Sequence, residues 1–92
     1  MEYFIEISEV AKANIAEVLD HYSKISNALK DRFEAEVSKS IDLLSKYPLQ
    51  HQIRYRKIRI AFTSVFPFGI HYIVENEYVY IFTILHTKRF FK

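Results

Sequence analysis

Residues 66–75 read Phe-Pro-Phe-Gly-Ile-His-Tyr-Ile-Val-Glu and contain the only glycine and one of the two prolines of the chain. Pro67 has a fixed φ angle and no N–H to donate, and Gly69 tolerates backbone angles that are closed to other residues. The pair therefore predicts a sharp reversal between two extended segments. After the reversal, large apolar side chains occupy every second position, which is the periodicity of a β-strand.

The composition indicates one compact unit. Half of the 92 residues are apolar, and the chain has one glycine and no cysteine. We expect residues 1–92 to form a single domain. Without cysteine, disulfides and cysteine-based zinc sites are excluded, and we expect neither a metal nor a cofactor. Acidic residues near the N-terminus and the lack of a long apolar run argue against a signal peptide or a membrane span, so we expect a cytoplasmic protein.

The charge is unevenly distributed, although the net value is only +2. Residues 1–42 carry nine acids and five bases, whereas residues 43–92 carry eight bases and two acids. Four of these bases fall within six positions with no acid among them: Arg54, Arg56, Lys57 and Arg59. Such crowding is costly unless a partner neutralises it, so we expect this segment to meet an anionic partner such as RNA or an acidic protein segment.

The first half of the chain predicts a strand and a helical hairpin. Residues 2–7 alternate in polarity as a short strand does. Ser8 is placed to cap a first helix, and residues that cap helices recur at Ser26 and Asn27 before a second apolar stripe. The second helix should end near Tyr47, because the residue before a proline is disfavoured in the α region. Both stripes are one-sided, so the two helices need a common surface to cover.

The second half predicts a meander of three strands over residues 53–62, 70–75 and 78–86. The periodicity of the first of these slips in phase, which predicts a bulge or break near Arg56 and Lys57. We expect the four bases named above to point outward from it. The last strand is apolar on both faces, with residues 78, 80, 82 and 84 on one face and residues 79, 81 and 85 on the other. The helices can cover one face, so we expect loops, the C-terminal tail, self-association or another chain to cover the second.

These patterns together resemble the RelE/ParE superfamily of toxins from bacterial type II toxin–antitoxin modules. The resemblance rests on residues 66–75 and on two flanking segments: Arg56-Lys57-Ile58-Arg59 and Ile84-Leu85-His86-Thr87-Lys88-Arg89. It implies a two-layer α+β fold, in which an N-terminal strand and a helical hairpin pack on a mostly antiparallel four-stranded sheet. It also implies a cognate antitoxin whose acidic, partly disordered segment wraps and neutralises the toxin.

The superfamily has two kinds of target. RelE-like members cleave messenger RNA on the ribosome without a metal ion, and ParE-like members inhibit DNA gyrase without a hydrolytic site. An RNase needs cations and proton-transfer groups, for which the candidates are Arg59, His86 and Arg89. The wider set expected to bind a partner or nucleic acid is Arg54, Arg56, Lys57, Arg59, Lys88 and Arg89.

The proton-transfer set is incomplete. The tail reads Phe90-Phe91 and has no hydroxyl, so neither side chain can move a proton. His71 alternates with core residues and is expected to serve packing. A gyrase-directed toxin is therefore favoured, with a ribosome-dependent mRNA endonuclease as the alternative. A non-toxic interaction domain is a third hypothesis, and a homodimer is compatible with each.

Overall fold

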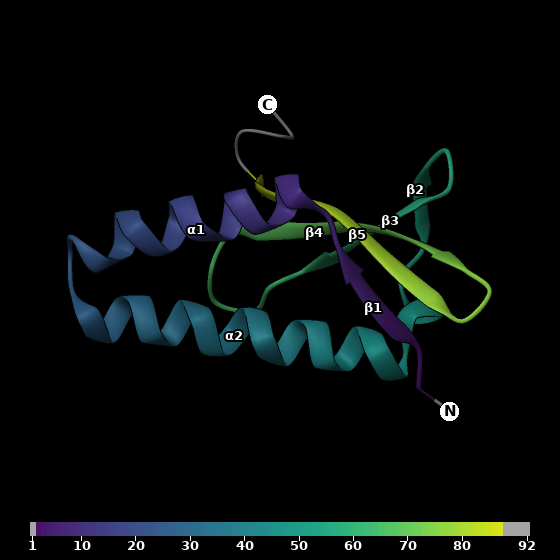
Figure 1. The fold of residues 1–92 in the computed structure, drawn as a ribbon, viewed down its shortest axis with the longest axis horizontal. Helices are drawn as coiled ribbons and strands as arrows, with labels where there is room; N and C mark the ends of the chain where they lie inside the picture. Colours follow the sequence, from purple (N-terminus) through teal and green to yellow (C-terminus); the bar gives the residue numbers. More distant parts are fainter. Residues whose placement is uncertain (1, 88–92) are drawn as a thin grey trace.

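The computed structural model describes residues 2–87, which form a helical hairpin packed on a five-stranded sheet (Figure 1). The elements are β1 (Phe4–Ile7), α1 (Glu9–Ser23), α2 (Asn27–Lys46), a short 3₁₀ helix η1 (Pro48–Gln50), β2 (Ile53–Tyr55), β3 (Ile58–Phe62), β4 (Phe68–Glu75) and β5 (Tyr78–His86). The strand order is β1-β5-β4-β3-β2, with β1 parallel to β5 and the other neighbours antiparallel. The predicted α+β class is confirmed, but the sheet has five strands instead of four. Within the described part of the chain, no helix combines the length and apolar character needed to cross a membrane.

Both helices begin where the sequence predicts. The Ser8 hydroxyl accepts a hydrogen bond from the Ala11 N–H at 3.0 Å, and the Ser26 hydroxyl accepts one from the Leu29 N–H at 2.9 Å. Each bond satisfies one of the backbone donors that a helix start leaves unpaired. The second helix ends at Lys46, just before Pro48.

The extra strand comes from the break predicted near Arg56 and Lys57. Tyr55 pairs with Ile58, so the two basic residues form a tight turn between β2 and β3. Arg56 has a φ of 52°, in the left-handed region that such turns use. The strands predicted over 70–75 and 78–86 leave two residues for a turn, and the structure has this turn, in which Asn76 has a φ of 55°.

The prediction for Gly69 was wrong in its position and in its reason. The reversal occupies residues 63–67, and Gly69 lies inside β4 without a positive φ. A Cβ atom at this position would lie 2.9 Å from Cγ2 of Ile60 on the adjacent strand β3. Ile60 pairs with His71, which lies two residues after Gly69 on β4. Glycine is therefore required by close side-chain packing across β3 and β4, and the turn does not require it.

The predicted alternation of β5 fails at its centre. Tyr72 pairs with Ile81 while His71 pairs with Thr83, so Phe82 is an additional residue in β5. A bulge of this kind reverses the phase of the following side chains. Ile84, which was expected to share a face with Tyr78, instead lies with the core on the helix side and is 3% exposed.

The core lies between the helices and one sheet face. Phe33 of α2 is fully buried, and its ring centroid is 5.4 Å from that of Phe66 and 5.3 Å from that of Phe68. Ile70 and Tyr72 of β4 are also fully buried. Complete burial of one such side chain contributes about 2–3 kcal/mol, so this aromatic cluster accounts for much of the contact between the layers.

The N-terminal part of α1 covers the edge of β5 that continues past the end of β1. The Ser8 hydroxyl donates to the Phe82 carbonyl, and Oδ1 of Asn14 accepts from the Thr83 hydroxyl at 2.6 Å and the Ile84 N–H at 3.1 Å. These bonds satisfy backbone groups that no strand pairs there.

Candidate functional site

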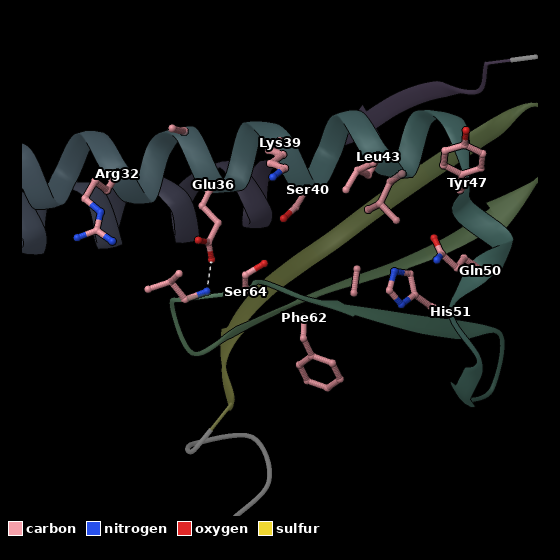
Figure 2. A pocket seen from close by; sticks show the side chains of 14 residues that line it. Arg32, Glu36, Lys39, Ser40, Leu43, Tyr47, Gln50, His51, Phe62 and Ser64 are labelled. Carbon is pink, nitrogen blue, oxygen red and sulfur yellow. Dashed lines mark hydrogen bonds between the residues drawn. The ribbon is translucent and has the colours of Figure 1, made fainter.

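A groove runs between α2 and the segment that includes β3 and the following loop (Figure 2). Its volume is about 580 Å³. One wall consists of α2 residues at helical spacing and of the residue that follows the helix: Arg32, Ala35, Glu36, Lys39, Ser40, Leu43, Leu44 and Tyr47. The other wall and the end consist of Gln50, His51, Ala61, Phe62, Ser64 and Val65.

The apolar part of the groove is open to solvent. Leu43 is 48% exposed, Tyr47 61% and Val65 67%. Isolated exposed apolar residues are common on proteins, but these three share one concave surface. The groove therefore offers apolar area for a partner to bury.

Glu36 holds the loop that forms one side of the groove. Its Oε2 accepts hydrogen bonds from the Val65 N–H at 2.9 Å and the Phe66 N–H at 3.2 Å (Figure 2). Because the carboxylate is charged, these bonds are stronger than bonds between neutral groups. They place the residues of the reversal against α2 and keep the groove in shape.

Arg32 and Lys39 give the groove a positive character. Neither side chain forms a hydrogen bond or ion pair with any residue in the range 2–87. The carboxylate of Glu36 lies between them in the sequence, but it is already bonded to the loop. The two cations are thus available to an anionic partner.

The backbone edge of β3 beside the groove is only partly paired. β2 pairs with β3 at Ile58 and Arg59, and residues 60–62 have no strand on that side. An unpaired edge presents N–H and C=O groups to any extended segment that lies along it. The groove therefore combines backbone hydrogen-bonding groups, apolar side chains and two cations.

Of the bases predicted to point outward, three do so. Arg54, Arg56 and Lys57 are exposed on the β2–β3 hairpin, and the Arg54 guanidinium lies 5.7 Å from the centroid of the Phe62 ring. Arg59 does not point outward. Its guanidinium donates to the His51 carbonyl, because residue 59 shares the helix-side face with its partner Tyr72.

This inward position makes Arg59 part of a small internal network. Tyr72 donates its hydroxyl hydrogen to the Pro48 carbonyl at 2.6 Å, and burial raises the pKa of Tyr72 to about 12. Burial, together with the nearby positive charge of Arg59, lowers the pKa of His51. The network anchors residues 48–51 on the sheet.

The structure does not bring Arg59 and His86 together. Arg59 pairs with Tyr72 and His86 pairs with Phe68, which places the two residues four positions apart along β4. At about 3.3 Å per residue, this separates them by roughly 13 Å along the strand. His86 packs its ring against Phe68, with centroids 5.3 Å apart. Lys88 and Arg89, as well as the tail aromatics, lie outside the described residues.

His71 is buried, with 1% of its surface exposed. Its Nδ1 lies 3.0 Å from the Tyr55 hydroxyl, which joins β2 to the sheet face opposite the helices. Burial lowers the pKa of His71, so the imidazole is neutral at pH 7 and can accept this hydrogen bond. The expected packing role of His71 agrees with this position.

The sequence analysis missed the groove. It treated α2 only as a stripe that covers the core, although residues 32, 36, 39, 43 and 47 already form a second stripe at helical spacing. That pattern of mixed charge and apolar side chains was the available signal. No group of three His, Asp or Glu side chains within residues 2–87 is arranged to hold a metal ion.

Comparison with known proteins gives one family. The sequence pattern of the family described as "ParE toxin of type II toxin-antitoxin system, parDE" matches residues 5–91. Among solved structures, a protein described as "Chromosomal ParDE TA system from P. aeruginosa" is similar, with a TM-score of 0.74 and 17% sequence identity. The similarity covers 92% of this chain and 96% of that chain. No curated protein matches.

Proposed function

Because the chain belongs to the ParE toxin family, it is the toxin of a type II toxin–antitoxin module, and we propose that its target is DNA gyrase. This family membership also implies a cognate antitoxin. The gyrase proposal is supported by the resemblance of the whole chain to ParE-like toxins, which act without a hydrolytic site. It is also supported by the position of Arg59, which is partly buried, binds the His51 carbonyl and is separated from His86.

We further propose that the antitoxin binds in the groove beside α2. An acidic segment that is disordered when free could lie along residues 60–62 as an added strand. Its carboxylates would meet Arg32 and Lys39, and its apolar side chains would cover Leu43 and Val65. The observation that carries this assignment is the coincidence of two unpaired cations with an unpaired strand edge.

The gyrase proposal is tested with the purified chain and purified gyrase. We expect the chain to inhibit ATP-dependent supercoiling of relaxed plasmid in proportion to its concentration. In a parallel translation reaction, mRNA on ribosomes should remain intact. Full gyrase activity at a large excess of toxin would contradict the proposal, and mRNA cleavage at the ribosome would favour the RNase alternative.

In that alternative, Arg59, His86 and Arg89 would supply the chemistry. Replacement of Arg89 by Ala should then abolish cleavage without a loss of folding, whereas in a gyrase-directed toxin neither Arg89→Ala nor His86→Ala creates or removes any RNA cleavage. RNA cleavage that is lost in Arg89→Ala would support the RNase alternative over gyrase inhibition.

The groove assignment is tested by charge reversal. The double variant Arg32→Glu/Lys39→Glu should keep its inhibitory activity but bind the antitoxin at least tenfold more weakly, because the carboxylates of the segment would then be repelled. The control Lys12→Glu/Lys24→Glu makes the same change in charge at an exposed position of α1 and at the residue that follows this helix. Equal loss of binding in both variants would contradict a specific groove contact, and unchanged binding in both would place the antitoxin elsewhere.

A further inference from the structure

The sheet face that points away from the helices, here called the open face, carries exposed aromatic side chains at its β1–β5 edge. Phe4, Tyr78 and Phe82 are exposed and Tyr80 is partly buried among them; the four are here called the aromatic patch. The Phe4 and Tyr78 rings lie 5.4 Å apart, and the Tyr78 and Tyr80 rings are stacked at 5.6 Å. Phe4 is 58% exposed. A contiguous patch of this kind on a small domain marks a surface that another molecule covers.

The charges around the aromatic patch are acidic. The register places Glu6 beside Tyr80 and Glu75 beside Tyr78, all on the open face. Both carboxylates border a hollow of about 430 Å³ that Tyr80 and Phe82 also line. Neither Glu6 nor Glu75 has an ion-pair partner among residues 2–87. The patch therefore fits a partner surface that carries basic side chains.

The opposite edge of the same face is basic. Arg54 lies over the ring of Phe62, and Phe62 points away from α2 (Figure 2). Arg56 and Lys57 form the adjoining turn. Arg59 of β3 pairs with Tyr72 of β4. If the same register continues toward the β2–β3 turn, Arg56 and Lys57 lie beside residues 74–75 of β4. The basic turn thus lies at the same end of the sheet as Glu75, as the β2–β3 and β4–β5 turns do in Figure 1.

We propose that the open face binds a second copy of the chain. When two sheets face each other across a two-fold axis parallel to the strands, the β1–β5 edge of each copy lies over the β2–β3 edge of the other. Glu6 of one copy then faces Arg56 and Lys57 of its partner, and the same contact recurs on the other side of the axis, while Glu75 on the central strand β4 lies close to the axis. Such reciprocity is what a two-fold dimer requires. It also covers the aromatic patch.

The size of the face limits the strength of this dimer. The five strands are spaced about 4.8 Å apart and have three to nine residues each, which gives a footprint of roughly 450 Å² per copy. The total of roughly 900 Å² lies in the range of weak, transient interfaces, so we expect dissociation in the high micromolar range. Because opposite charges at the rim contribute, added salt should weaken the association.

The test uses sedimentation velocity of the purified full chain between 5 and 500 μM. One variant, Glu6→Lys/Glu75→Lys, makes both edges basic, and another, Arg56→Glu/Lys57→Glu, makes both edges acidic. We expect each variant alone to dissociate at least tenfold more readily than the unmodified chain. An equimolar mixture of the two should associate again, since every rim contact then joins opposite charges. The quadruple variant should also regain self-association.

The matched control is Asp31→Lys/Glu34→Lys, which makes the same change in charge on exposed positions of α2 and should leave the association unchanged. Circular dichroism and urea midpoints verify that each variant is folded. A monomer throughout the concentration range would overturn the proposal. So would a mixture that associates no better than its two components, because the complementary edges would then not meet.

Discussion

Replacement of Gly69 by Ala tests the packing of the central strands. The new Cβ would lie 2.9 Å from Cγ2 of Ile60, although an ordinary contact needs at least 3.4 Å. The surroundings must therefore yield by about half an ångström, while β4 is held by β3 and β5 on its two sides. Overpacking of this kind costs about 1–3 kcal/mol, and the loss of glycine freedom in the unfolded chain offsets about 0.4–1 kcal/mol. We expect a net loss of about 1–2 kcal/mol.

Urea unfolding measures this loss as a decrease of roughly 0.5–1.5 M in the midpoint, given the slopes usual for small domains. A double-mutant cycle identifies its cause. Ile60→Ala alone should cost about 2–4 kcal/mol by leaving a cavity, but Gly69→Ala should cost little in the Ile60→Ala background, because the Cβ then enters the vacated space. Additive costs in the double variant would refute steric packing as the reason for this glycine, and a stabilised Gly69→Ala protein would refute it as well.

Three further predictions concern stability. Tyr72→Phe removes the bond to the buried Pro48 carbonyl and should cost about 1–3 kcal/mol in urea unfolding. Because burial raises the Tyr72 pKa to about 12, the unfolded state binds fewer protons than the native state above pH 10. The free energy of unfolding should therefore fall between pH 10 and 12, and it should fall less in Tyr72→Phe. Equal dependence on pH in the two proteins would contradict this. Ser8→Ala removes both the helix cap and the bond to Phe82 and should lower stability by about 1–2 kcal/mol, whereas an effect under a few tenths would show that water replaces them. Burial lowers the pKa of His71, so the unfolded state binds more protons than the native state below pH 6.5. The urea midpoint should therefore fall as the pH decreases from 7 to 5.5, and it should fall less in His71→Phe. The same dependence of the midpoint on pH in both proteins would exclude a contribution from His71.

Features set by neighbouring residues could be predicted from the sequence. Ser8 and Ser26 cap helices through bonds that span three positions, and Pro48 ends α2 through a local steric effect. The break at Arg56 and the turn at Asn76 follow from the same kind of local information, since both interrupt a period of two. These elements predict a helical hairpin and a meander of strands, and the resemblance to the RelE/ParE superfamily implied the α+β class.

Features set by contacts across the sheet could not be predicted. The role of Gly69 depends on its contact with Ile60 of the neighbouring strand β3. The periodicity of β4 does not show which residue of β3 lies against Gly69. The bulge at Phe82 depends on the pairing of β5 with β4, and it alone decides which face Ile84 occupies. Arg59 was expected to point outward because its strand partner could not be known from the sequence. Its pairing with Tyr72 and its hydrogen bond to the His51 carbonyl fix the face on which it lies.

The candidate site was only partly accessible from the sequence. An acidic partner segment was expected from the charge asymmetry, and the residues chosen to meet it were on the β2–β3 hairpin. The groove instead joins Arg32 and Lys39 of α2 to the unpaired edge of β3. These segments are distant in the sequence, so the site is visible only after the layers are packed.

The most direct test of the account is induction of this chain alone in bacteria, with growth, plasmid supercoiling and mRNA integrity followed in the same culture. We predict that growth stops, that the linking-number distribution of a reporter plasmid shifts toward the relaxed form, and that transcripts show no cleavage at codon boundaries. Undisturbed growth would contradict the assignment as a toxin. Growth arrest with normal supercoiling and codon-specific cleavage would contradict gyrase as its target.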